Sequence, residues 1–219
     1  MKHKFKSGGI ITDSSSRYEH FINVIRASIE MSRQNLAALD QSYLDIIHSI
    51  SIMVAKCISS GGKVLICGNG GSASDAMHIA GELIGRFKLE RRPYHVVALG
   101  TNIAAATAIG NDYGYEHIFE RETLGLGDEG DILIGISTSG NSKNVIAALN
   151  AARTLKMKTI GFTGKNGGKM KCDGLCDVIL NVPSDDTPKI QEMHITCGHI
   201  ICQLAEIVLS ESEKNNESR

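Results

Sequence analysis

Residues 63–85 read KVLICGNGGSASDAMHIAGELIG and decide the fold. The run Val64–Cys67 is apolar without helical spacing, which is typical of a strand buried on both faces of a parallel sheet. The chain then turns through residues 68–71, the glycine loop, whose members are Gly68, Asn69, Gly70 and Gly71. Small residues leave the backbone amides of this loop open to an anion or a hydroxyl-rich ligand. A helix is expected to begin at residues 72–75.

Two helices carry polar pairs at helical spacing. On the helix after the glycine loop, His78 and Glu82 are four residues apart, so an imidazole and a carboxylate share one face. The last helix, expected from about residue 190 to 209, has Gln191 and His199 on one broad face, with Ile195 between them. A lone histidine on a helix is usually structural. Two helices that each bring such a pair indicate a site.

Composition limits the class of protein. The chain has 219 residues, of which 42% are hydrophobic, with a formal net charge of -1 and a pI near 6.7. These values predict one α/β domain and argue against binding of nucleic acid by bulk charge. The first residues lack a signal-peptide core and no run of about 18 apolar residues occurs, so we expect a cytoplasmic protein without a membrane span. The six cysteines lack paired CxxC spacing and are expected to be reduced core residues.

The segment before the first strand predicts a tail and two helices. Residues 1–14 are expected to be a flexible tail, 15–209 a single domain, and 210–219 a polar C-terminal tail. Apolar residues at helical spacing predict amphipathic helices over 16–34 and 44–58, with Asp40 as a cap between them. We expect their apolar stripes to be buried between subunits. The alternative is that both helices cover the sheet of their own chain.

Four more strands are expected after the glycine loop. They are predicted at 94–99, 131–136, 158–163 and 177–182, each separated from the next by a helical segment. This alternation predicts an α/β fold with a doubly wound, five-stranded parallel sheet flanked by helices. Ligands bind such sheets at the carboxyl ends of the strands.

Residues 131–144, DILIGISTSGNSKN, repeat the design of the first strand and its loop. Four hydroxyl side chains and the start of the helix at 142–155 favour a phosphate here, because helix N-termini attract anions. These side chains are Ser137, Thr138, Ser139 and Ser142. The nucleotide-binding motifs GxxxxGK[ST] and GxGxxG do not fit the chain.

Asn111 and Asp112 lie between Gly110 and Gly114 and predict a tight polar turn. Both residue types are common in turns, so this position is either only a turn or part of a ligand site.

At this point the chain is identified as a member of the sugar isomerase (SIS) domain family, and within it resembles the phosphoheptose isomerases from about residue 20 to 209. The resemblance is carried by CGNGGSASDAMHIAGEL, GNDYGY, GISTSGNSKNV, TGKNGGKM and PKIQEMHITCGHIICQL. It implies a SIS fold. It also implies that the substrate site is lined by Asn69, Gly70, Gly71, Ser72, Glu82, Asn111, Asp112, Ser137, Thr138, Ser139, Ser142 and Gln191.

The resemblance further implies a metal site and an assembly. One zinc ion per subunit would be bound by His78, Glu82, Gln191 and His199, with Glu82 and His199 also catalytic. Members of the family form homotetramers whose active sites lie at subunit interfaces. The chain departs from many members in its longer N-terminal tail, in Gly81 instead of a second Glu, and in Lys189 instead of Arg.

The implied reaction interconverts sedoheptulose 7-phosphate and D-glycero-D-manno-heptose 7-phosphate, the first step in making activated bacterial heptose. It moves a proton from C1 to C2 through an enediolate, which needs a base and an acid. Two alternatives stay open. One is a non-catalytic SIS protein that binds the bacterial replication initiator, although Glu82 and His199 favour an enzyme. The other is an isomerase of a different phosphosugar, such as arabinose 5-phosphate.

Overall fold

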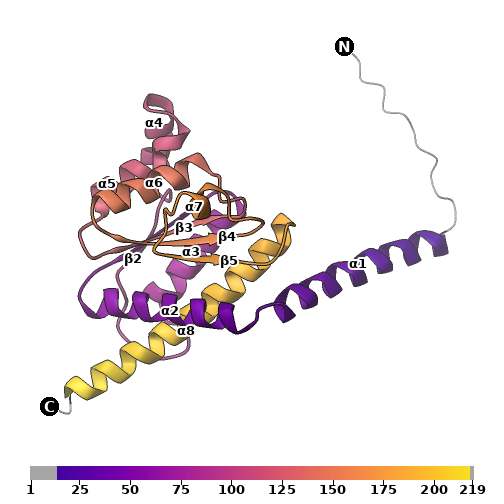
Figure 1. The fold of residues 1–219 in the computed structure, drawn as a ribbon, viewed down its shortest axis with the longest axis horizontal. Coiled ribbons are helices and arrows are strands. Elements are labelled where there is room, and N and C mark those ends of the chain that lie inside the picture. The colour runs from indigo at the N-terminus through magenta and orange to yellow at the C-terminus, as the bar shows by residue number, and fades with distance from the viewer. Residues whose placement is uncertain (1–13, 218–219) are drawn as a thin grey trace.

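The computed structural model describes residues 14–217, and the side chains of residues 15–212 (Figure 1). The predicted flexible tail therefore lies outside the described residues, except for Ser14, which begins the first helix. The elements are, in order, α1 (Ser14–Ala37), α2 (Gln41–Ser59), β1 (Val64–Gly68), α3 (Gly71–Ile84), β2 (Val96–Ala98), α4 (Ile103–Asp112), the 3-10 turn η1 (Tyr115–His117), α5 (Ile118–Leu126), β3 (Ile132–Ser137), α6 (Lys143–Thr154), β4 (Lys158–Thr163), α7 (Gly168–Cys172), β5 (Val178–Asn181) and α8 (Thr187–Glu217).

The five strands form one parallel sheet in the order β2-β1-β3-β4-β5. Every residue of β1 and β3 is buried, as expected for central strands that are covered on both faces. From β1 the chain moves outward to β2 and then returns to β3 on the other side. The strand order therefore reverses between β1 and β3, and the crevice between their carboxyl ends is where such folds bind ligands. The predicted fold class is confirmed.

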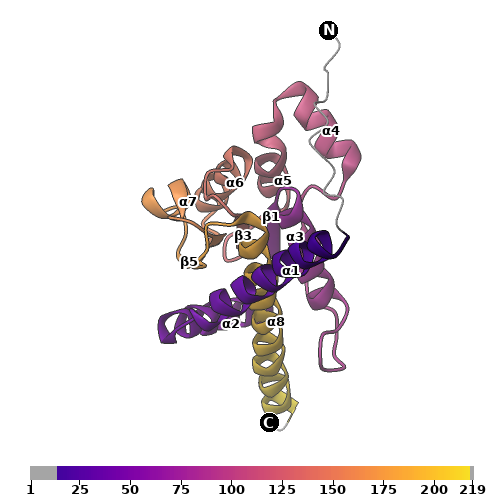
Figure 2. The ribbon, with the colours of Figure 1, turned by 90° about the vertical axis from the view of Figure 1, so that its right-hand side faces the viewer.

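Alternate residues of the central strands build two separate cores. Ile66 and Ile134 point into a core that includes side chains of α2, α3 and α8. Leu65 and Leu133 point into a second core with α5, α6 and α7. Figures 1 and 2 show the two groups of helices on opposite faces of the sheet, which gives the three layers of a doubly wound fold.

The two N-terminal helices differ in what they cover. The carboxylate of Asp40 accepts a hydrogen bond from the amide of Ser42 at 2.9 Å and caps α2, as predicted. Helix α2 buries Ile50 and Val54 in the core of its own chain, so the alternative prediction is correct for this helix. Helix α1 instead extends away from the body as an arm (Figure 1). Its apolar stripe is exposed at Tyr18, Phe21, Val24, Ile25, Ile29 and Met31.

Some element bounds differ from the prediction. The second strand spans only Val96–Ala98 rather than residues 94–99, because it is an edge strand paired on one side alone. The last helix begins at Thr187 and continues to Glu217, so residues 210–217 of the expected polar tail are helical. This segment, SESEKNNE, contains no glycine or proline that would end the helix.

Helices α2 and α8 are long and apolar enough to cross a membrane by length and composition alone. Their apolar residues are used in the core, where Ile50, Val54, Ile201 and Leu209 are each at most 2% exposed. Core packing therefore accounts for this composition. All six cysteines are free; four are buried, Cys176 is partly buried and Cys172 is exposed.

Candidate functional site

The glycine loop brings open backbone amides to the carboxyl end of β1. Gly70 has a φ of 57°, a left-handed conformation that favours glycine. At Gly71 a Cβ atom would lie 2.5 Å from the side-chain nitrogen of Gln191, so a side chain here would displace the Gln191 amide. Helix α3 starts directly after this turn and directs the positive end of its dipole at the crevice. Ser72 is buried below the loop and 3% exposed.

Asn69 is held in place by two residues that the sequence analysis did not single out. Its amide and that of Asn144 exchange two hydrogen bonds of 2.8 Å each, and the hydroxyl of Tyr115 donates to the Asn69 oxygen at 2.7 Å. Asn144 is 2% exposed at the start of α6. One signal in the sequence could have indicated Asn144: it is a polar residue at a position that continues an apolar helix stripe. These bonds join the glycine loop to the start of α6 and to η1.

The serine-rich loop after β3 lies on the other side of the crevice. The hydroxyls of Ser137 and Ser142 are hydrogen-bonded at 2.9 Å, and the hydroxyl of Ser139 accepts from the amide of Asn141 at 3.2 Å. Ser142 is the N-cap of α6 but makes no side-chain capping bond, so amides at the start of this helix remain available. The loop, including Thr138, therefore presents hydroxyls and amides to an anion.

Asn111 and Asp112 form the last turn of helix α4 rather than a tight turn, so that prediction was wrong. Gly110 is tolerated inside the helix, and the chain reverses only at Gly114, which has a φ of 102°. Both polar side chains are exposed, and the Asn111 amide donates to the Asp112 carboxylate at 2.8 Å. Helix α4 extends away from the sheet in Figure 1.

His78, Glu82 and His199 form a cluster between helices α3 and α8. Their potential ligand atoms lie within 4.8 Å of one another. The Nε2 atom of His78 lies 3.1 Å from a Glu82 carboxylate oxygen and 3.3 Å from Nε2 of His199. Zinc bonds of about 2.0–2.2 Å in a tetrahedron place neighbouring ligand atoms about 3.3–3.6 Å apart. Two imidazoles and a carboxylate are a donor set that zinc accepts, and the separations of 3.1 and 3.3 Å are close to this range, although the cluster as a whole extends to 4.8 Å.

Gln191 lies at the other end of the same helix pair. Its amide lies against Gly71, whereas His199 contacts His78, so α3 and α8 run side by side in the same direction. The seven residues from Gly71 to His78 correspond to about 10 Å along the helix axis. The structure therefore places the Gln191 amide beside the glycine loop. Its assignment as a metal ligand stays a prediction.

Two further ionisable groups lie on these helices. Asp75 is one turn before His78 on α3, and one of its carboxylate oxygens is buried without a hydrogen-bond partner. Burial raises the pKa of Asp75 to about 6. His194 is fully buried and contacts the carbonyl of Thr163 through Nε2 at 3.0 Å; burial lowers its pKa to about 4, so it is neutral. His194 lies off the Gln191–His199 face and has a structural role.

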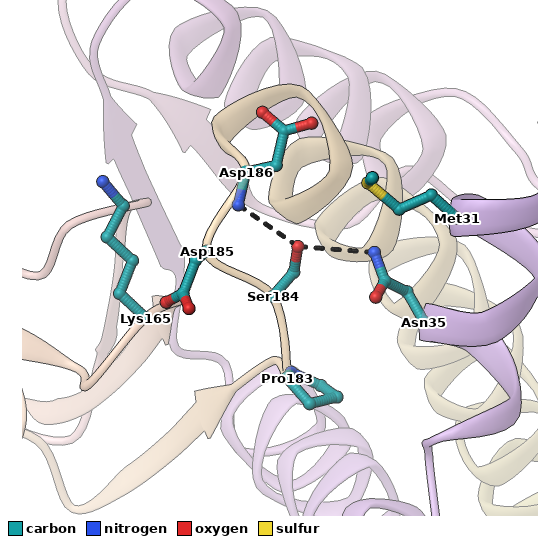
Figure 3. Close-up of a pocket in the computed structure, with 7 residues that line it drawn as sticks. All are labelled: Met31, Asn35, Lys165, Pro183, Ser184, Asp185 and Asp186. Atoms are coloured by element: carbon teal, nitrogen blue, oxygen red, sulfur yellow. Dashed lines mark hydrogen bonds between the residues drawn. The ribbon is translucent and has the colours of Figure 1, made fainter. Parts of the chain in front are cut away.

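Two cavities lined by described residues lie away from the cluster. One of about 190 Å³ lies behind the glycine loop and is lined by Asn69, Gly70 and Tyr115, among others. A larger one, of about 510 Å³, lies between α1 and the chain from β5 to α8 (Figure 3). There Asn35 of α1 donates to the hydroxyl of Ser184 at 3.3 Å. Since one wall of this cavity is the projecting arm α1, its shape depends on what packs against α1.

Comparison with known proteins agrees with these observations. The sequence model of the SIS domain family matches residues 29–164. The chain is 52% identical over 178 residues to the phosphoheptose isomerase of Aliarcobacter butzleri, covering 81% of this chain and 93% of the relative. It is 51% identical over 177 residues to that of Helicobacter pylori, covering 81% and 89%.

Solved structures give the same result. A phosphoheptose isomerase from Francisella tularensis superimposes with a TM-score of 0.80 at 36% identity, covering 84% of this chain and 97% of the other. One from Neisseria gonorrhoeae gives a TM-score of 0.78 at 39% identity, covering 84% and 99%. The chain therefore belongs to the SIS domain family, and within it to the phosphoheptose isomerases, which are sugar-phosphate isomerases.

Proposed function

We propose that this enzyme interconverts sedoheptulose 7-phosphate and D-glycero-D-manno-heptose 7-phosphate. The observation that carries the proposal is the His78, Glu82 and His199 cluster in a fold whose relatives are named phosphoheptose isomerases. An aldose–ketose isomerisation needs a base and a second proton carrier, and a bound metal ion can stabilise its enediolate. The product is a precursor of activated bacterial heptose.

We propose that the phosphate binds at the crevice between β1 and β3. The hydroxyls of Ser137, Thr138, Ser139 and Ser142 and the amides at the start of α6 would hold its oxygens. The glycine loop, with Asn69, Gly70, Gly71 and Ser72, would hold the sugar hydroxyls, together with the Gln191 amide next to it. Asn111 and Asp112 would contribute from the exposed end of α4.

The proton transfers are assigned to Glu82 and His199. The Glu82 carboxylate removes the C1 proton of the ketose, which leaves an enediolate across C1 and C2. His199 moves a proton between the two oxygens, and the carboxylic acid returns a proton to C2 to form the aldose. No net proton is gained or lost. The 3.3 Å contact between His78 and His199 keeps the second imidazole close to the same carboxylate.

We propose that His78, Glu82 and His199 hold a zinc ion, and that the Gln191 side chain turns from Gly71 toward the cluster to become a fourth ligand. Two of these donors come from α3 and two from α8, so the ion would also tie the helices together. When bound, zinc polarises the substrate carbonyl and lowers the free energy of the negatively charged enediolate.

We propose that the working enzyme is a cytoplasmic homotetramer with active sites at subunit contacts. In one chain the cluster lies about 10 Å along α3 from the glycine loop. Exposed apolar side chains lie near it on both helices, at Met77 and Ile84 of α3 and at Ile200 and Ile207 of α8. A second copy that covers this face would remove the cluster from water and bring its own loops close to it.

Removing the metal tests this proposal. A strong chelator is expected to abolish isomerase turnover, because the enediolate then lacks its main source of positive charge. Added zinc should restore turnover to the untreated rate. The measurement is aldose formation from sedoheptulose 7-phosphate before chelation, after it and after zinc addition, with the metal content of each sample determined by mass spectrometry. Full turnover in protein without metal would contradict the zinc assignment.

A further inference from the structure

A buried ion pair lies below the cluster. Arg91 and Glu206 are in contact at 3.0 Å, and their side chains are 3% and 1% exposed. Arg91 belongs to residues 85–92, the loop that follows α3, and Glu206 belongs to α8. Burying two charges has a large desolvation cost, so their remaining hydrogen-bonding groups must also be satisfied.

Glu206 satisfies its own oxygens with the loop backbone. Its carboxylate accepts hydrogen bonds from the amides of Phe87, Lys88 and Leu89 at 3.2, 2.8 and 2.9 Å. These bonds and the charge of Arg91 hold the pKa of Glu206 below its usual value although burial acts in the opposite direction. Glu206 is seven residues after His199, two turns along the same face of α8. The carboxylate therefore draws the loop onto the face that carries His199.

Arg91 uses its remaining donors on the end of α3. Its guanidinium donates to the carbonyls of Glu82, Leu83 and Gly85 at 2.9, 3.0 and 3.0 Å. Glu82 and Leu83 belong to the last turn of α3 and Gly85 is its C-cap, so these carbonyls have no partner within the helix. One ion pair thus joins the end of α3, next to Glu82, with the loop and with α8.

The loop places an aromatic ring on the cluster. Phe87 stacks on the imidazole of His199 with ring centroids 5.6 Å apart and planes 20° apart. His78 meets the same imidazole edge-on, with centroids 4.8 Å apart. The His199 ring is therefore held by two neighbouring rings, which restricts its rotation about the terminal side-chain bond.

We propose that Phe87 is a positioning residue for His199, and that the Arg91–Glu206 pair holds Phe87 in that place. The inference rests on the proposed metal centre. An imidazole that is already fixed loses little conformational freedom when it binds an ion, and binding is therefore stronger. Neighbouring groups that orient a ligand typically contribute about 10- to 100-fold to metal affinity. Phe87 touches neither substrate nor metal in this assignment and acts only through His199.

A pair of substitutions at residue 87 tests the proposal. Phe87→Leu keeps an apolar side chain but removes the ring face, and Phe87→Tyr keeps the ring. Zinc affinity is measured by competition with a chromophoric chelator, alongside KM, kcat and the thermal midpoint of the metal-free proteins. We expect the Leu variant to bind zinc about tenfold more weakly, with lower kcat and unchanged KM. The Tyr variant should match the unmodified protein in zinc affinity and kcat. The thermal midpoints of all three metal-free proteins should be equal, because Phe87 is only partly buried.

Glu206→Gln tests the link to the ion pair. The glutamine amide offers donors where three backbone amides need acceptors, so the loop should detach and zinc binding should weaken as in the Leu variant. Because both changes act through one contact, the double variant should bind zinc no more weakly than Glu206→Gln alone. If Glu206→Gln does not fold, the two substitutions at residue 87 still test the role of Phe87.

Equal zinc affinity and kcat in Phe87→Leu and the unmodified protein would overturn the role of Phe87. If the losses of zinc affinity were fully additive in the double variant, the position of Phe87 would not depend on Glu206. If the unmodified protein itself binds no zinc, the proposed metal centre fails, and this inference fails with it.

Discussion

Glu82→Gln is expected to lower hydrogen exchange at C1 of sedoheptulose 7-phosphate by about 10²- to 10⁴-fold, the usual contribution of a proximal base. The substitution keeps the size of the side chain and one oxygen but removes the group that takes the proton. Any weakening of the metal site would add to the loss. Substrate binding, measured by calorimetry, should change much less, because the phosphate loops are elsewhere in the chain.

Ser139→Ala is the matched control. It removes one hydroxyl from the serine-rich loop and leaves the cluster intact, so the loss should be in KM, by about tenfold for one hydrogen bond to a charged group. A Glu82→Gln protein that exchanges C1 hydrogen at the unmodified rate would show that Glu82 is not the base. A Ser139→Ala protein with unchanged KM would remove this hydroxyl from the phosphate site.

Ile25→Asp combined with Ile29→Asp is expected to dissociate the assembly and abolish activity together. Both side chains lie on the arm α1 and are 52% and 65% exposed in the single chain. Central apolar residues of an interface contribute about 2 kcal/mol each, so two charges there should raise the dissociation constant about a thousandfold. The measurement is mass by light scattering across a dilution series, with turnover assayed on the same samples.

Asn23→Asp is the control for added charge on α1, because Asn23 is also exposed but is polar in the unmodified chain. It should leave both mass and turnover unchanged. The interface role of α1 would be contradicted if the double variant kept the mass and the turnover of the unmodified protein.

Much of the fold could be predicted from local sequence. The runs Val64–Cys67 and Ile132–Ile136 are apolar at every position but Gly135, a pattern that is typical of strands covered on both faces. The capping hydrogen bond of Asp40 is also local, because its donor and acceptor are only two residues apart. His78 and Glu82 could be paired because helical spacing alone brings them together.

Two kinds of feature could not be predicted. One is a contact with a distant part of the chain, and the other is a helix end that depends on small differences in helix propensity. The helix stripe around Asn144 marks it as unusual, but it does not indicate that the partner is Asn69, 75 residues earlier. Phe87 is one of two apolar residues in the loop of residues 85–92, and the hydrogen bond that its amide donates goes to Glu206, which is 119 residues further along. The end of α4 was misjudged at Gly110, since glycine costs a helix only about 1 kcal/mol and does not have to end it.

We propose that this chain isomerises sedoheptulose 7-phosphate by moving a proton between C1 and C2. The most direct test is to incubate the full chain, loaded with zinc, with that substrate in deuterated water and follow both carbons by NMR. The account predicts an aldose heptose 7-phosphate that carries solvent deuterium at C2. The absence of both aldose and exchange, in protein that binds the substrate in calorimetry, would contradict it.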